Sequence, residues 1–153
     1  MATATMNDQA VDLLNQLIET CKDGAQGFRL AESSVKSPDL KQLFGSYAGQ
    51  RAMFGGQLQA EVEQLGGSPE KSGSMAATLH RGWMNIKAAV TGHDECSIVA
   101  ECERGEDAAL KAYEQATHTM LPATVQAMVQ QQHEQIKEAH DRIHALALAC
   151  THS

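Results

Sequence analysis

Carboxylate and imidazole side chains occur in this chain at spacings that could hold a metal ion. Glu106 is followed seven residues later by Tyr113, and His133 and His140 are also seven residues apart. Seven residues are two turns of a helix, so the members of each pair share one helix face. Carboxylates and imidazoles are ligands for iron, zinc and other divalent ions. If their helices lie side by side, Glu106 with His133 or His140 could hold one such ion.

Glu106 also belongs to a second pattern, in which a charge interrupts an apolar stripe. Arg51 lies within one stripe and Glu106 within another, and the apolar members recur at steps of three and four: Leu40, Phe44, Tyr47, Phe54 and Leu58, then Ile98, Cys102, Ala109, Tyr113 and Ala116. That spacing lines one face of a helix. A charge on such a face loses water on folding, so it needs a partner or a metal.

Two interpretations follow from the interrupted stripes. The first is a buried ion pair between Arg51 and Glu106 that replaces a metal, within a structural polar core that also holds Tyr113 and His140. The second is a reduced metal site, in which Glu106 and either His133 or His140 weakly hold one iron or other divalent ion. A lone histidine on an apolar face, such as His140, is more often a hydrogen-bonded core residue than a ligand.

Composition limits the classes of function. The 153 residues include 12 Lys and Arg and 19 Asp and Glu, for a formal net charge of −7. An acidic chain without a basic run is a poor candidate for binding nucleic acid or anionic membranes. No segment reaches the roughly 20 apolar residues of a membrane span, and the start of the chain lacks the basic region of a signal peptide.

The four cysteines, Cys21, Cys96, Cys102 and Cys150, form no C-x-x-C pair, which argues against zinc-ribbon and thioredoxin motifs. Cys21 and Cys102 have the spacing of small core residues. We therefore expect a cytoplasmic protein with reduced thiols and no required cofactor.

Start and stop signals for helices divide the chain. Ser37-Pro38-Asp39 combines a capping serine, a first-turn proline and an acid, Gly66-Gly67 marks a stop, and Pro122 opens the last helix. Val, Ile and Thr form no alternating runs, so no strand is expected. We predict helices over residues 7–34, 38–65, 74–91, 93–118 and 122–149.

The connections between these helices predict the fold class. Short connections make 7–34 and 38–65 antiparallel, and likewise 93–118 and 122–149, whereas the long helical connection 74–91 lets 38–65 and 93–118 run parallel. An all-α four-helix bundle with one such crossover is the ferritin-like arrangement. We expect one domain over residues 7–149, with flexible ends at 1–6 and 150–153.

This chain matches the metal-binding pattern of ferritin-like bundles poorly. That pattern places carboxylates and Glu-x-x-His motifs in one layer at mid-bundle. The midpoints of the four long helices here are Cys21, Arg51, Glu106 and His133. An arginine repels cations and does not lose its proton. We therefore expect no dinuclear iron centre.

The helix predicted over 38–65 also carries a stripe of small residues opposite its core face: Gly45, Gly49, Ala52, Gly56 and Ala60. Glycine within a helix costs roughly 0.5–1 kcal/mol relative to alanine, so close packing of another element is expected there. The crossover helix is the favoured occupant, through the side that carries Trp83. A second copy of the chain is the alternative, and we expect a homodimer.

Several of these segments also carry a family resemblance. They are LIETCKDG at 17–24, GF at 27–28, QR at 50–51, LHRGW at 79–83, ECERGEDAALKAY at 101–113 and AHDR at 139–142. In this combination, over residues 8–148, the chain resembles a bacterial family of ferritin-like four-helix bundles catalogued as a domain of unknown function. The resemblance implies a ferritin-like fold and a cytosolic, stress-related role, but no defined activity. Gln57 stands where an acid is expected in relatives.

Two functions remain open at this point. One is a non-enzymatic bundle that acts in stress protection or as a binding module. The other is an iron-handling protein or oxidase with a reduced carboxylate–histidine site.

Overall fold

The described part of the chain is helical throughout. The computed structural model describes residues 2–69, 82–83, 85–92 and 94–151. These residues form five helices and no strand: α1 (Ala2–Ser34), α2 (Pro38–Gln64), α3 (Ile86–Thr91), α4 (Glu95–Thr117) and α5 (Ala123–Thr151). The expected all-α helical bundle is confirmed. Several ends of the four long helices differ from the predicted ranges by one or two residues, and the largest difference is that α1 begins five residues before the predicted 7–34.

Local capping explains where two of the long helices begin. The Ser37 side chain accepts a hydrogen bond from Leu40 N at 3.3 Å, and Pro38 occupies the first turn of α2. Asp94 caps α4 by accepting from Cys96 N at 3.3 Å. Glu95 in turn accepts hydrogen bonds from the backbone N–H groups of Lys36 and Ser37, at 2.6 and 3.1 Å. The α1–α2 turn is thereby tied to the start of α4.

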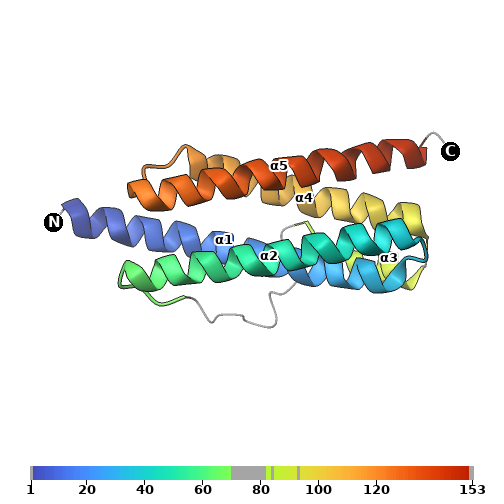
Figure 1. Ribbon diagram of the computed structural model, residues 1–153, viewed down its shortest axis with the longest axis horizontal. Helices are drawn as coiled ribbons and strands as arrows, with labels where there is room; N and C mark the ends of the chain where they lie inside the picture. Colours follow the sequence, from blue (N-terminus) through green and yellow to red (C-terminus); the bar gives the residue numbers. More distant parts are fainter. Residues whose placement is uncertain (1, 70–81, 84, 93, 152–153) are drawn as a thin grey trace.

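The four long helices lie side by side with neighbours antiparallel. α1 packs against α2 and α4, α4 packs against α5, and α2 meets α5 over a smaller contact. Figure 1 shows α1 and α5 running in one direction and α2 and α4 in the other, so α2 and α4 are parallel as the long crossover predicted. The N- and C-termini lie at opposite ends of the bundle (Figure 1).

The described part of the crossover does not take the position expected for it. Residues 74–81 of the predicted helix lie outside the described residues, and the described helical part is α3 alone. α3 contacts α1 and α4 and makes no contact with α2. The prediction that this helix covers the small-residue stripe of α2 is therefore wrong for α3 and Trp83.

Trp83 packs between α1 and α4 instead. Its ring is 2% exposed and meets Phe28 edge to face, with 5.0 Å between the centroids. Cβ atoms built on Gly27 and Gly105 would lie 2.3 and 2.1 Å from the indole, so only glycines fit at these two positions. A large ring that fills space between two helix backbones explains why both helices carry glycine there.

The apolar core is divided into two clusters along the bundle. One contains Leu14, Leu58 and Tyr113, and the other contains Phe28 and Ile98. On α2 and on α4, Arg51 and Glu106 stand between the residues of one cluster and those of the other. The two charges that interrupt the apolar stripes therefore form a polar layer between two apolar layers.

The cysteines differ from the expectation of four reduced thiols. Cys96 and Cys150 form a disulfide, with 5.7 Å between their Cα atoms, that joins the first turn of α4 to the last turn of α5. Cys21 and Cys102 are free and buried, as expected of small core residues. Because α4 and α5 are antiparallel and joined by a short connection, residues near their outer ends meet. None of the described helices is long and apolar enough to cross a membrane.

Candidate functional site

The centre of the bundle is occupied by a buried salt bridge between α2 and α4. Arg51 and Glu106 are 1% and 0% exposed. Nη1 and Nη2 of Arg51 each donate to one carboxylate oxygen of Glu106, and both distances are 2.6 Å. This bidentate arrangement is the strongest geometry for such a pair. The pairing expected from the two charges in apolar stripes is therefore present.

Further contacts fix the Arg51 guanidinium. Its Nε donates to Gln50 Oε1 at 3.2 Å, and its carbon lies 5.5 Å from the centre of the Phe28 ring. Burial lowers the pKa of Arg51, but the charge and hydrogen bonds of Glu106 outweigh burial and raise the pKa overall. The guanidinium therefore stays cationic at any physiological pH.

A second polar chain runs from Tyr113 through the core. The Tyr113 hydroxyl donates to Gln132 Oε1 at 2.6 Å, and Gln132 Nε2 donates to Gln57 Oε1 at 2.9 Å. Cys21 Sγ lies 3.3 Å from the same hydroxyl. Since the hydroxyl has one proton and gives it to Gln132, the Cys21 thiol is the donor in its contact with Tyr113.

Burial makes both groups poor acids. It raises the pKa of the Cys21 thiol to about 11, although the charge of Arg51 acts in the opposite direction. It also raises the pKa of Tyr113 well above its usual value. A protonated thiol is not a nucleophile, so Cys21 has the environment of a structural cysteine.

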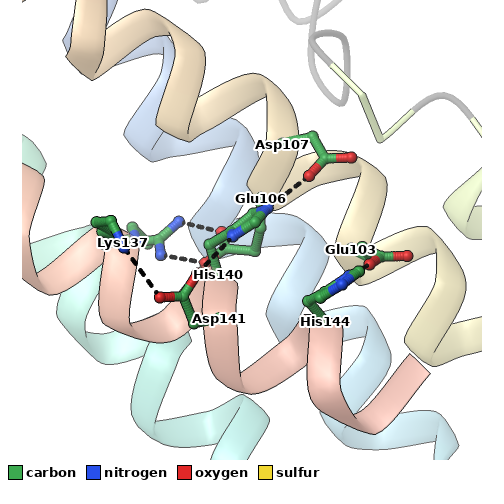
Figure 2. Close-up of polar contacts among 8 residues, drawn as sticks. Glu103, Glu106, Asp107, Lys137, His140, Asp141 and His144 are labelled. Carbon is green, nitrogen blue, oxygen red and sulfur yellow. Dashed lines mark hydrogen bonds and ion pairs between the residues drawn. The ribbon is translucent and has the colours of Figure 1, made fainter. Parts of the chain in front are cut away.

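The histidines of α5 lie at its contact with α4, outside this polar layer. His140 is 18% exposed, with Nε2 2.6 Å from Asp107 Oδ1 and Nδ1 3.1 Å from Asp141 Oδ1. His144 Nδ1 pairs with Glu103, and the two imidazole rings are stacked with 6.1 Å between their centroids. We call these two cross-helix pairs the α4–α5 seam (Figure 2). The sequence placed His140 in the buried core, whereas its polar atoms face carboxylates at the surface.

The third histidine has a different environment. Nε2 of His133 is buried and has no hydrogen-bond partner within the described parts of the chain. His133 lies seven residues before His140 on α5, and so on the same face of that helix.

These side chains do not fit the metal centre that the ferritin-like template implies. Both oxygens of Glu106 are held by Arg51, and both ring nitrogens of His140 are held by Asp107 and Asp141. A fixed cation in contact with both carboxylate oxygens repels a second cation. Over the described ranges, no three His, Cys, Asp or Glu side chains are grouped so that they could hold a metal ion.

A comparison with protein families places the chain. Residues 9–119 match the model of the family described as Domain of unknown function (DUF2383). The chain belongs to this family. No curated protein matches the chain. The match spans α1, α2, α3 and α4, and therefore includes both members of the Arg51–Glu106 pair.

Three residues of this family member carry polar interactions that the sequence analysis missed. Glu101, which lies outside the apolar stripe of its helix, is 4% exposed, accepts from Asn85 N at 2.8 Å and pairs with Arg104. It therefore holds the start of α3 against α4. Gln132 is 2% exposed and Gln57 is its partner. Gln132 falls at helical spacing between Val129 and Ile136, which is the same signal of an interrupted stripe that singled out Arg51.

Proposed function

We propose that this chain is a ferritin-like bundle that works by binding or association rather than by catalysis, with a salt bridge where related bundles hold metal. The domain extends over residues 7–149. The observation that carries the proposal is the bidentate contact between Arg51 and Glu106 at mid-bundle. A guanidinium supplies the positive charge that would otherwise come from a metal ion, and it supplies it permanently.

Iron loading tests this proposal directly. The protein is purified without chelators, titrated anaerobically with ferrous iron and then exposed to oxygen. We expect less than one tightly held iron per chain and no absorption from an oxo-bridged pair. Two irons per chain with an oxo-bridged spectrum would establish a dinuclear site and overturn the proposal.

The second candidate is a single metal ion at Glu106 with His133 or His140. The observation that favours it is the buried, unpaired Nε2 of His133. The variants Glu106→Gln and His133→Gln are titrated with ferrous and zinc ions beside the native protein. Loss of a stoichiometric ion in both variants would support this candidate. Weak binding that neither substitution changes would reject it.

Association with a second copy is part of the proposal. The outer face of α2 exposes Gly49, Ala52, Gly56 and Ala60, together with Met53 at 54% exposure. Cβ atoms built on Gly49 and Gly56 would meet nothing within 4 Å, so the described residues leave this face uncovered. We propose that a twofold partner packs there, as small residues permit close approach of two helices.

Sedimentation tests the association. The native protein is expected to form a dimer, and Met53→Lys is expected to shift it to monomer because it introduces a charge into the interface. Gln126→Lys, a change on α5, serves as the control and should leave the dimer intact. A native protein that remains monomeric at high concentration would refute the dimer.

A cytoplasmic, stress-related role is the remaining part of the proposal. Its support is the acidic composition and the partly exposed Cys96–Cys150 pair, which can exist as two thiols in a reducing compartment. An oxidant such as hydrogen peroxide then accepts two electrons from the thiols as the disulfide forms and two protons leave. Thiols are alkylated during cell lysis, before and after peroxide treatment. We expect two alkylated cysteines at this pair before treatment and none after it, whereas a permanent disulfide would place the chain in an oxidising compartment.

A further inference from the structure

A cavity lies between α1 and α2, beside the buried salt bridge. Its volume is about 390 Å³, which is within the size range of small-molecule sites. Four small residues, Ala25 on α1 and Ala52, Gly55 and Gly56 on α2, form part of its wall. Their size leaves space between two helices that otherwise pack closely. We call this cavity the α1–α2 groove.

The groove has a cationic lining in an acidic protein. Lys22 and Arg29 of α1 contribute positive charge to its wall, whereas the charge of Arg51 is balanced by Glu106. None of the described lining residues is Asp or Glu. The whole chain carries a formal net charge of −7. Lys22 is half-buried and Arg29 is exposed, so both can adjust to a ligand at the opening. A local positive potential in an acidic surface concentrates anions at that point.

Arg51 also has hydrogen-bonding capacity that the protein does not use. A guanidinium has five N–H groups. Nε donates to Gln50, and one N–H from each of Nη1 and Nη2 goes to Glu106. Each terminal nitrogen retains a second N–H, for which the described residues offer no acceptor. Nη1 lies next to α1, where a Cβ on Gly24 would be 3.4 Å away. A second N–H on a terminal nitrogen of Arg51 can donate to an anionic ligand without breaking the contacts to Glu106.

We propose that the α1–α2 groove binds a small organic anion, a carboxylate or phosphate monoester with a compact apolar body. Its charged group lies near Arg51, Lys22 and Arg29, and its body packs on the alanines and glycines of the wall. Cys21 also lines the groove, but its buried thiol donates to Tyr113 and stays protonated. The site therefore holds its ligand without forming a covalent bond to it.

The first test compares ligands that differ in charge but share a ring. Native protein labelled with ¹⁵N is titrated with benzoate, phenyl phosphate, benzyl alcohol and inorganic phosphate, at a concentration where sedimentation gives a single species. We expect saturable shifts of the Ala25, Gly55 and Gly56 amides with benzoate or phenyl phosphate, and a dissociation constant below about 1 mM. Benzyl alcohol and inorganic phosphate should bind at least tenfold more weakly. Equal binding of either one, or no saturable binding of the two organic anions, would overturn the proposal.

The second test fills the groove. Gly56→Leu places a side chain in the groove at an exposed position of a helix interior, where added atoms meet nothing within 4 Å and helix propensity improves. Gly49→Leu is the matched control, since Gly49 lies two turns earlier on the same proposed dimer face, is equally open and does not line the groove. We expect Gly56→Leu to lose anion binding and Gly49→Leu to retain it. Retention by both would overturn the proposal.

The third test removes charge from the rim. Lys22→Gln with Arg29→Gln should weaken organic-anion binding at least tenfold, whereas Lys41→Gln with Lys111→Gln should leave it within about twofold. Arg29, Lys41 and Lys111 are exposed and Lys22 is half-buried. The circular dichroism spectrum of each variant is used to check that it is folded. Equal losses from the two double variants would mean that net charge alone attracts the anion, which contradicts a site in the groove.

Discussion

Two sets of acid–base pairs link helices of the bundle, one set in the buried core and the other at the surface. Arg51 and Glu106 are 1% and 0% exposed and connect α2 with α4 through two hydrogen bonds. The α4–α5 seam pairs His140 with Asp107, at 18% and 61% exposure, and His144 with Glu103, at 52% and 24%. The chemistry of the two sets is similar, but their access to water differs.

This difference determines what each pair contributes. Burying two charges costs desolvation free energy, which a well-aligned pair offsets by its mutual attraction. Removal of one partner therefore leaves an unpaired charge in the core. An exposed pair is screened by water and salt and contributes little to stability. Arg51 therefore stays charged across physiological pH, whereas the seam contains His140, whose pKa is raised from its ordinary value. Five predictions test this contrast, from the largest expected effect to the smallest.

Removal of one buried charge should have the largest effect. Glu106→Ala orphans Arg51 and is expected to lower the free energy of unfolding by about 3–5 kcal/mol, as measured by urea denaturation. Arg51→Met combined with Glu106→Leu should cost much less, because no charge remains buried. If the single and double variants lose the same amount, Arg51 and Glu106 do not act as a pair.

Loss of the disulfide should rank second. Cys96→Ser with Cys150→Ser opens a link that spans 54 residues and is expected to lower the free energy of unfolding by about 2–4 kcal/mol. The loss arises at the end of the bundle that contains the seam. Native protein with and without a reducing agent provides the control, and reduction should reproduce the effect of the double variant. An unchanged urea midpoint would mean that α5 needs no covalent tie to α4.

The neutral part of the buried polar layer should respond next. Tyr113→Phe removes the donor to Gln132 and the acceptor for Cys21, so a buried carbonyl oxygen loses its partner. We expect a loss of about 1–3 kcal/mol in the free energy of unfolding. Tyr47→Phe serves as a comparison, as Tyr47 is half-buried and no hydrogen bond of its hydroxyl is seen among the described residues. Similar losses in both variants would argue against a specific role of the Tyr113 hydroxyl.

Neutralisation of a seam carboxylate should have a small effect. Asp107→Asn and Glu103→Gln are each expected to change the free energy of unfolding by less than about 1 kcal/mol. The change should shrink further in high salt, since exposed charges are screened. A loss as large as that from Glu106→Ala would show that partial exposure does not weaken these pairs.

The smallest effect is a pH dependence of stability carried by His140. Burial lowers the pKa of His140, but the hydrogen bonds that its ring donates to Asp141 and Asp107, together with the charges of these carboxylates, raise the pKa above its ordinary 6.5. The folded protein then binds this proton more tightly than the unfolded chain. The stabilisation is full below pH 6.5 and is lost as the pH rises through the raised pKa.

Urea midpoints measured from mildly acidic to mildly alkaline pH test this dependence. Asp107→Asn should reduce the loss of stability that accompanies rising pH. Lys41→Gln, which changes a remote charge, should not reduce it. The groups that face His140 are Asp107 on α4 and Asp141 on its own helix, while Lys137 pairs with Asp141 and Glu103 with the stacked His144. A decline that persists unchanged in Asp107→Asn would assign the effect to another group.

The helices were predictable from the sequence because their signals are local. Apolar steps of three and four, together with caps such as Ser37, depend on residues within one or two turns. The same periodicity identified Arg51 and Glu106 as buried charges that needed partners. Gln132 also interrupts an apolar stripe and is also buried. An amide in such a stripe is a weaker indication of a buried polar contact than a charge.

The arrangement of partners was decided by tertiary structure. Trp83 fills the gap between Gly27 and Gly105 rather than the small stripe of α2, and it is enclosed there by two helices. Glu101 is buried where the start of α3 contacts α4. The pattern of apolar residues along α4 alone does not predict this burial. Cys96 and Cys150 meet since α4 and α5 are antiparallel, although they are 54 residues apart in the chain. Sequence periodicity determined which faces are buried, whereas contacts between distant segments depend on how several helices fill space together, and no local pattern encodes that.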